Sequence, residues 1–378
     1  MPEKPPVTAI ELFAGIGGFR IACDQLGIKT VWANDMKEHA CGVYRKRFGE
    51  SELIEGDIKS LKIGIPSGFD VLTGGFPCQP FSGAGKKKGV FDVRGTLFRD
   101  IIEIVEKRKP KAFVLENVKR ILGLQKGGTF KTILSELSVL DYQIEWRIVN
   151  CRSFGLAQNR ERILIIGVRH DVCSSSKILH DIQADDYTKI EGVKVSKIED
   201  HKGAFQFWGR LQGDVVIQQK LDSKVSEFGD VKLKDFLQKP TEVPENFDFT
   251  ESTLARLGGN TPRNKFVHGV EILSNQEGGR RMGYTIFGEN GIAPTLTATT
   301  SRIYERYKIG DVYRILTNVE YGRLQGFDDD HCDQMLLGNG TVEPLSAYKQ
   351  YPLYGNAIPP QLGKWALQIV LRQINNTL

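Results

Sequence analysis

Short apolar runs alternate with segments of helical apolar spacing along the first 170 residues. The runs predict buried strands, and the spacing between them predicts amphipathic helices. The expected strands span residues 7–13, 30–34, 71–74, 112–115, 143–149 and 163–168, and the expected helices span 19–26, 37–48, 96–106 and 129–140. This alternation is typical of an α/β fold with a doubly wound, mostly parallel sheet.

The pattern changes at about His170, where the sequence becomes polar and irregular, with Gly-Gly pairs at 258 and 278. We expect a second, smaller domain of loops and short strands in this stretch. Regular apolar spacing returns near Tyr313, and residues 361–376 are expected to form a closing amphipathic helix.

Several candidate chemical groups lie directly at the predicted strand ends. Phe13, Asp35, Cys78 and Glu116 each follow or end an apolar run. Because ligands of open α/β sheets bind beyond the carboxyl ends of the strands, we expect one cleft to hold all four residues.

Composition and charge narrow the class of protein. The chain has 378 residues, 40% of them hydrophobic and 26% charged. It has no apolar run near the roughly 18 residues of a membrane span, and its first residues lack an apolar signal core, so a cytoplasmic protein is expected. The six cysteines are too widely spaced for a metal knuckle or a CxxC pair, which predicts free thiols and no metal.

The net charge of +5 is too small to indicate a nucleic-acid partner by itself, but its distribution is uneven. Residues 86–120 hold eleven Lys or Arg against five Asp or Glu, and residues 256–308 hold eight against four. Two basic segments suit phosphate contacts from two sides, although two solvated faces explain the charge equally well.

Cys78 lies in the stretch Phe76-Pro77-Cys78-Gln79-Pro80, directly after an apolar run. A lone cysteine is most often a small buried hydrophobe. The flanking prolines instead indicate a stiff loop, in which a thiolate is placed to act as a nucleophile.

Five blocks, taken in order, resemble the cytosine-C5 DNA methyltransferases. They are Glu11 to Arg20, Gly74 to Ser82, Glu116-Asn117-Val118, Gln158 to Arg162 and Tyr354 to Ile358. The resemblance implies a Rossmann-like methyltransferase domain made from residues 1–175 and 313–378. A target-recognition domain, residues 176–312, would be inserted between the two parts.

The resemblance implies four catalytic residues. Cys78 would add to carbon 6 of a flipped-out cytosine, and Glu116 would donate a proton or hydrogen bond to ring nitrogen 3. Arg160 and Arg162, two residues apart on an extended segment, would hold the exocyclic oxygen of the base and steady the catalytic loop.

The same resemblance implies S-adenosylmethionine as the cofactor. Phe13 would pack against the adenine and Asp35 would accept the ribose hydroxyls, although a helix N-cap is the simpler reading of Asp35 alone. The remaining expected cofactor residues are Gly15, Gly17, Met36, Asp57, Ile58, Pro77, Leu97, Asn356 and Ala357. Met36 stands where the family often has a large aromatic residue, and Ala357 where it usually has serine.

Duplex DNA is the expected partner. Residues 82–94 have the composition of a loop that closes over DNA, or of a plain surface loop, and arginines suit guanine edges and phosphates. The candidate DNA contacts are Ser82, Lys86, Lys87, Arg94, Arg280, Arg281, Thr295, Arg302 and Arg306.

We therefore expect an enzyme that methylates carbon 5 of a cytosine in a short, specific duplex DNA sequence. It would be a monomer of the bacterial restriction-modification type, with a cognate endonuclease that shares its site. Two alternatives remain open: a tRNA-cytosine methyltransferase of the same family, and a catalytically silent DNA-binding protein.

Overall fold

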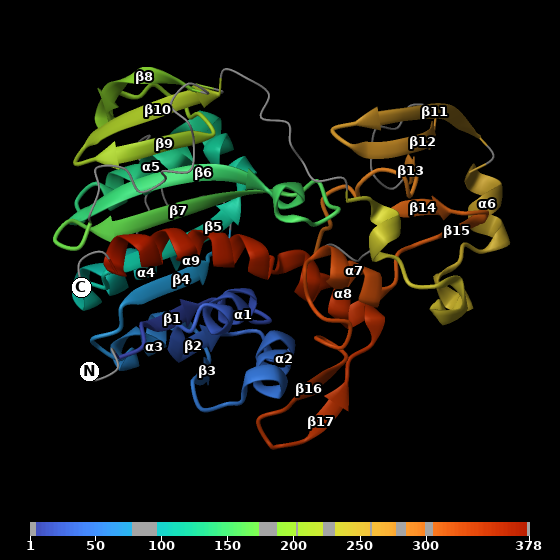
Figure 1. Ribbon diagram of the computed structural model, residues 1–378, viewed down its shortest axis with the longest axis horizontal. Helices are drawn as coiled ribbons and strands as arrows, with labels where there is room; N and C mark the ends of the chain where they lie inside the picture. Colours follow the sequence, from blue (N-terminus) through green and yellow to red (C-terminus); the bar gives the residue numbers. More distant parts are fainter. Residues whose placement is uncertain are drawn as a thin grey trace, which may run out of the picture.

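The computed structural model describes residues 5–77, 97–173, 187–201, 203–221, 231–257, 259–276, 285–298 and 305–375. The described elements form two lobes, a large one around a ten-stranded sheet and a small one around a five-stranded sheet (Figure 1). Helices α7 (Asn318–Leu324) and α8 (Ala347–Asn356) lie between the two sheets.

One half of the large sheet is parallel, with the order β3-β2-β1-β4-β5. The strands are β1 (Thr8–Leu12), β2 (Lys29–Asp35), β3 (Leu53–Glu55), β4 (Val71–Gly75) and β5 (Ala112–Val118). Strand order reverses between β1 and β4, which is the position where open α/β sheets bind their ligands. Gly75, at the end of β4, pairs in register with Glu116 on β5.

The other half of the sheet is antiparallel and continues in the order β7-β6-β9-β10-β8. Its strands are β6 (Tyr142–Asn150), β7 (Glu161–Arg169), β8 (Tyr187–Lys194), β9 (Trp208–Gln212) and β10 (Val215–Leu221). The predicted α/β fold is thus confirmed, with a mixed sheet whose parallel character is confined to β1 to β5. Apolar runs predicted these strands but carry no information on direction.

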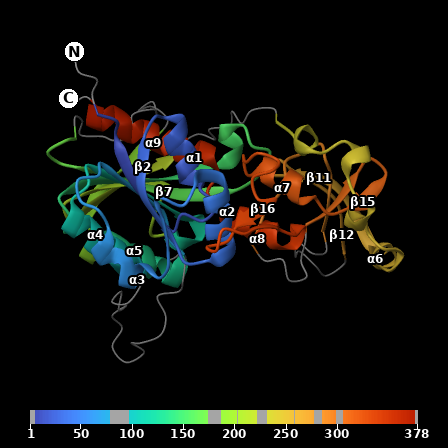
Figure 2. The same ribbon diagram turned by 90° about the horizontal axis from the view of Figure 1, so that it is seen from below.

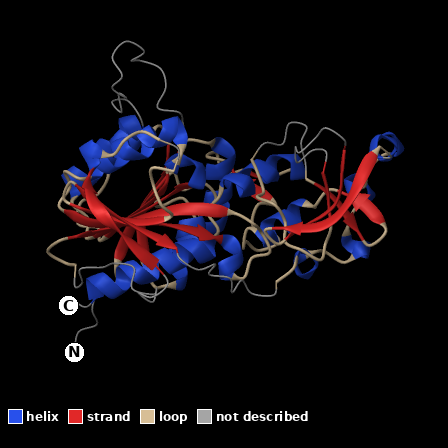
Figure 3. Cartoon of the chain, turned by 90° about the horizontal axis from the view of Figure 1, so that it is seen from above, coloured by secondary structure: helices blue, strands red, loops and turns tan. Residues whose placement is uncertain are grey.

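Helices cover both faces of the large sheet (Figures 2 and 3). One face carries α1 (Gly18–Gln25) and α9 (Pro360–Asn375), and the other carries α3 (Ile58–Leu61), α4 (Leu97–Arg108) and α5 (Gly128–Leu137). In α4 the buried residues Phe98, Ile101, Ile102 and Val105 recur at helical spacing and face the sheet. None of the helices in the described ranges is long and apolar enough to cross a bilayer.

The last part of the chain packs against the first. Helix α9 contacts α1, β5 and β7. A Cβ added to Gly363 would lie 3.1 Å from Cδ1 of Phe19, and one added to Gly18 would lie 2.2 Å from the Ile358 carbonyl oxygen. Glycine at these two positions lets the two ends of the chain meet closely.

Helix α2 (Glu38–Phe48) packs against α8 (Ala347–Asn356) and against the small hairpin of β16 (Gln334–Leu336) and β17 (Val342–Pro344). The residues after α7 (Asn318–Leu324) therefore reach the helix that follows β2.

The small lobe contains the second sheet, with strand order β11-β12-β13-β14-β15. Its elements are α6 (Glu251–Leu257), β11 (Asn260–Val267), β12 (Val270–Gln276), β13 (Thr285–Phe287), β14 (Arg306–Ile309) and β15 (Val312–Arg314). The segment 176–312, expected as one inserted domain, thus supplies strands to both sheets: β8 to β10 extend the large sheet, and the second sheet begins at residue 260.

We predict that Gly209→Ala lowers the free energy of unfolding by about 1–3 kcal/mol, as overpacking of a core does. Gly209 lies in β9, and a Cβ there would be 2.2 Å from Cζ2 of the fully buried Trp146 on β6. Gly64→Ala is the control, since a Cβ there meets no atom within 4 Å. Urea unfolding compares the two, and equal midpoints would show that β9 does not pack on Trp146.

Candidate active site

A cavity of about 630 Å³ opens where the parallel strands end. Its walls come from the loop after β1, the ends of β2, β4 and β5, the start of β7, residues 295–298 and the junction of α8 and α9. Eight of the eleven expected cofactor residues line it, namely Phe13, Gly15, Asp35, Met36, Pro77, Leu97, Asn356 and Ala357. The cavity therefore gathers residues from both ends of the chain.

The glycine loop after β1 turns sharply beneath this cavity. Phe13, Gly15 and Gly17 have φ angles of 55°, 57° and 84°, in the left-handed region that favours glycine. Gly17 N–H donates to the Ala14 carbonyl over 2.9 Å, which closes the turn. A Cβ added to Gly15 would meet no atom nearer than 4.0 Å, so the loop leaves open space in front of its backbone.

Asp35 fixes the loop from the end of β2. Its Oδ2 accepts the Gly15 N–H at 2.8 Å, and its Oδ1 accepts the N–H groups of Met36 and Lys37 at 2.8 and 2.9 Å. The carboxylate is buried but still lines the cavity. Met36 is 61% exposed there, which leaves its thioether free to contact a ligand.

Three expected cofactor residues do not line the cavity. Gly17 faces Phe48, since a Cβ there would lie 2.3 Å from Cε2 of that ring. Asp57 caps α3 by accepting the Lys59 N–H at 3.0 Å, and Ile58 is buried. Asp57 and Ile58 thus belong to the start of α3 and not to the cavity wall.

The opposite end of the cavity holds a buried ion pair. Glu116 lies in the buried part of β5, near its end, and Arg162 stands at the start of β7, where it pairs in register with Val118. Arg162 Nε lies 2.8 Å from Glu116 Oε1, and both side chains line the cavity. Burial raises the pKa of the Glu116 carboxyl, and the positive charges of Arg162 and Arg160 oppose that rise.

Arg160 is not part of the cavity wall. Its fully buried guanidinium donates to the carbonyls of Leu296, Gly355 and Ala357 at 2.9, 2.9 and 3.0 Å. Although Arg160 and Arg162 are two residues apart, only Arg162 reaches the cavity. Burial lowers the pKa of Arg160 to about 9, with the charge of Arg162 as the next cause.

Cys78 lies outside the described residues, as do Ser82, Lys86, Lys87 and Arg94. The strand that precedes Cys78 is held at the cavity, because Asn117 Nδ2 donates to the Phe76 carbonyl at 3.0 Å and Pro77 lines the wall. A Cβ on Gly75 would lie 3.2 Å from Glu116 Oε2. The end of β4 therefore lies against the Glu116 carboxyl.

Only two of the expected DNA contacts on the recognition side lie within the described residues. Thr295 lines the cavity and donates through Oγ1 to the Asn159 carbonyl at 2.6 Å. Arg306 begins β14, with its guanidinium 5.8 Å from the centre of the Phe249 ring. Arg280, Arg281 and Arg302 lie outside the described ranges.

Sequence reasoning missed several residues of the site. Lys119 and Arg120 line the cavity directly after the Glu116-Asn117-Val118 block, where their position beside that motif is a usable signal. Gln158 is fully buried, and its amide donates to the Leu324 carbonyl at 3.0 Å and accepts the Leu296 N–H at 3.0 Å. Such backbone partners leave no pattern in the sequence.

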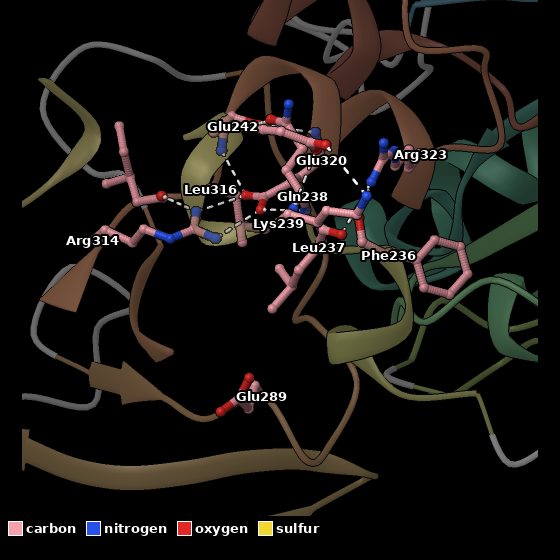
Figure 4. Close-up of polar contacts among 12 residues, drawn as sticks. Phe236, Leu237, Gln238, Lys239, Glu242, Glu289, Arg314, Leu316, Glu320 and Arg323 are labelled. Atoms are coloured by element: carbon pink, nitrogen blue, oxygen red, sulfur yellow. Dashed lines mark hydrogen bonds and ion pairs between the residues drawn. The ribbon is translucent and has the colours of Figure 1, made fainter. Parts of the chain in front are cut away.

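Helix α7 is fastened to the small lobe through a buried carboxylate (Figure 4). Glu320 accepts two 2.7 Å bonds from Arg314 at the end of β15, and it also accepts the N–H groups of Thr317 and Gln238 at 2.9 and 3.0 Å. Arg323, one turn on, donates to the Leu237 carbonyl at 3.1 Å. The strand, the helix and residues 236–238 are therefore held as one unit.

Residues 7–370 match the family described as C-5 cytosine-specific DNA methylase, and the chain belongs to that family of enzymes. The Type II methyltransferase M.HhaI of Haemophilus parahaemolyticus is 42% identical over 356 residues, which cover 92% of this chain and 89% of M.HhaI. The family resemblance inferred from the five sequence blocks is thus confirmed.

Other relatives match over less of their length. M.HpaII of Haemophilus parainfluenzae, also a Type II methyltransferase, is 49% identical over 173 residues, 44% of this chain and 48% of M.HpaII. Four further Type II methyltransferases likewise align over about half of their length. The solved structure of S. pombe Dnmt2 methyltransferase has a TM-score of 0.62 at 16% identity, covers 98% of this chain and 99% of its own, and shows the methyltransferase fold.

We predict that Arg160→Met lowers the free energy of unfolding by about 2–5 kcal/mol, because three buried carbonyl groups lose their donor. Arg263→Met removes an exposed arginine from β11 and should change stability by less than about 0.5 kcal/mol. Urea denaturation of the two variants tests this. Equal stability of both would mean that the Arg160 bonds contribute nothing to the fold.

Proposed function

We propose that the chain transfers a methyl group from S-adenosylmethionine to carbon 5 of a cytosine in a specific duplex DNA sequence. The observation that carries this proposal is the single cavity that holds the glycine loop and Asp35 at one end and the Glu116–Arg162 pair at the other. A methyl donor and an acceptor base bound there would face each other. Family membership supplies the reaction class.

The residues present fit the cofactor. The open space in front of Gly15 admits a ligand close to the backbone, and Asp35 keeps lone pairs for ribose hydroxyls beside the N–H groups that it already accepts. Met36 and Leu97 would cover the adenine, and Asn356 would approach the amino-acid end. When bound, S-adenosylmethionine supplies an electrophilic methyl group.

The protein's own groups would make the base reactive. The Cys78 thiolate adds to carbon 6 while the Glu116 carboxyl gives a proton to nitrogen 3, so that carbon 5 becomes nucleophilic and takes the methyl group. Loss of the proton from carbon 5 to water then expels the thiolate, and nitrogen 3 returns its proton to the Glu116 carboxylate. The base must leave the DNA stack to reach this cavity.

The two arginines would have separate roles. Arg162 pairs with Glu116 at the cavity wall, and there it would orient the carboxyl and contact the exocyclic oxygen of the base. Arg160 would act as a positioning residue, since all its described partners are backbone carbonyls around the site.

Recognition of the DNA sequence would belong to the small lobe. Its five-stranded sheet is separate from the catalytic sheet, so we place the recognition unit at residues 231–314 and assign β8 to β10 to the catalytic lobe. Thr295, Arg306 and the arginines at 280, 281 and 302 remain the proposed DNA contacts there. We further propose a monomer that shares its site with a cognate endonuclease.

Among the described cysteines, four are poor nucleophiles. Cys23, Cys41, Cys151 and Cys332 are buried, and burial raises the pKa of each thiol, that of Cys151 to about 11. A raised pKa leaves almost no thiolate at neutral pH. Cys173 is half-buried but does not line the cavity, whereas Cys78 directly follows Phe76 and Pro77, which do.

We predict that duplex DNA carrying 5-fluorocytosine at the target position forms a covalent adduct with Cys78 in the presence of S-adenosylmethionine. Fluorine cannot leave carbon 5 as a proton does, so the thiolate is not expelled. Peptide mass spectrometry would locate the adduct. Cys78→Ser should form none while still binding DNA, and an adduct on another cysteine would remove Cys78 from its proposed role.

A further prediction concerns Glu116 and pH. Because burial raises its pKa, the proton-donating form persists above the usual range of a glutamate, and methyl transfer should fall as pH rises through that raised pKa. Glu116→Gln should lower the single-turnover rate by about 10²- to 10⁴-fold and remove this alkaline limb. Glu106→Gln, an exposed change on α4, is the control. An unchanged pH profile in Glu116→Gln would contradict the role.

A further inference from the structure

His331 lies against the glycine loop but does not line the cavity. It follows the end of α7 by seven residues and is 2% exposed. Its Nε2 lies 2.7 Å from the carbonyl oxygen of Ile16, the central residue of the loop. No motif in the sequence marks this histidine.

The imidazole must donate this hydrogen bond. A carbonyl oxygen only accepts, so the proton has to reside on Nε2. Burial lowers the pKa of His331 to about 4, so the ring is neutral at neutral pH and carries one N–H. The charged groups that act on the His331 ring are Arg47, Asp328 and Asp330. The Arg47 guanidinium pairs with Asp328 at 3.5 Å and with Asp330 at 3.1 Å.

The Ile16 carbonyl belongs to the same peptide plane as the Gly17 N–H, which closes the turn on Ala14. Fixing the carbonyl from behind therefore fixes which way that N–H points. The glycines on either side have positive φ angles and resist peptide rotation little by themselves. Ile16 and its neighbours Gly15 and Gly18 line the cofactor cavity.

The histidine is itself held firmly. Its ring packs 4.7 Å from Phe327 and 6.2 Å from Phe48, and Phe48 fills the space beneath Gly17. Its backbone N–H donates to the Asp328 carbonyl at 3.1 Å. Arg323 of α7 pairs with Asp329 at 2.7 Å, so the turn that carries His331 is fastened to the helix.

We propose that His331 is a positioning residue for the cofactor: its Nε2–H holds the peptide between Ile16 and Gly17 in the orientation that S-adenosylmethionine binding requires. This inference rests on the function proposed above. Strand β15 is anchored to α7 through Glu320. The turn that follows α7 contacts the cofactor loop directly through His331.

The test compares His331→Phe, which keeps an aromatic ring but removes the donor, with His331→Gln, whose amide N–H can replace Nε2–H. A neighbouring cavity of about 310 Å³ gives either side chain room to settle. Isothermal titration with S-adenosylhomocysteine should show a dissociation constant raised about threefold to tenfold in His331→Phe. The value for His331→Gln should stay within about twofold of the unaltered protein.

Tyr351→Phe is the matched control, because the Tyr351 hydroxyl donates to the Leu316 carbonyl at 2.6 Å in the same part of the chain but away from the cavity. It should leave cofactor affinity unchanged, and DNA affinity should be unchanged in all three variants. Equal cofactor affinity in His331→Phe and the unaltered protein would overturn the inference, as would equal weakening in His331→Phe and His331→Gln. Failure of the unaltered protein to bind S-adenosylhomocysteine would instead overturn the proposed function.

Discussion

The guanidinium of Arg160 joins three parts of the chain that lie far apart in the sequence. A fully buried cation is costly unless hydrogen-bond acceptors surround it, and here three backbone carbonyls do so. Two of them, from Gly355 and Ala357, flank Asn356 at the cofactor end of the cavity. The third, from Leu296, belongs to the segment between β13 and β14 of the small lobe. The fold can close around this cation only if all three segments are in place.

Two residues beyond Arg160, Arg162 meets Glu116 at the base end of the same cavity. The two proposed positions, for the cofactor and for the base, are thus tied to the same short segment, residues 160–162. Two sets of contacts attach the small lobe. Residues 293–298 run beside Gln158 to Arg160, and Arg314 at the end of β15 binds Glu320 on α7. Both attachments use buried, well-partnered polar groups, which favour one fixed arrangement of the lobes over a loose hinge.

The sequence predicted the parts of the molecule that have strong local signals. The strands β1, β2 and β4 to β7 appear as apolar runs, and helices α1, α2, α4, α5 and α9 appear through apolar spacing. The fold brings these candidates together in one cavity: Glu116, Arg162 and eight of the expected cofactor residues. Strand β3 escaped prediction because Leu53-Ile54-Glu55 is too short to show a period. Strands β8 to β10 escaped because polar residues interrupt their apolar positions, as Gln218, Gln219 and Lys220 do in β10.

The roles proposed for Arg160 and His331 could not be predicted in the same way. Their partners are backbone carbonyls up to 315 residues away, and every residue has a backbone carbonyl. Only the packed fold shows which carbonyl a side chain reaches. The motif block assigned both arginines to catalysis. In the structure the Arg160 side chain is bound by buried backbone carbonyls, whereas the Arg162 side chain lines the cavity.

We propose that this cavity methylates carbon 5 of cytosine in duplex DNA. The most direct measurement is nucleoside mass spectrometry, with bisulfite sequencing, of plasmid DNA from cells that express the protein, alongside tRNA from the same cells. We expect 5-methyldeoxycytidine at one short recurring sequence in the plasmid and no added 5-methylcytidine in the tRNA. Methylation confined to tRNA, or a methyl group on an exocyclic nitrogen of the DNA, would contradict the account.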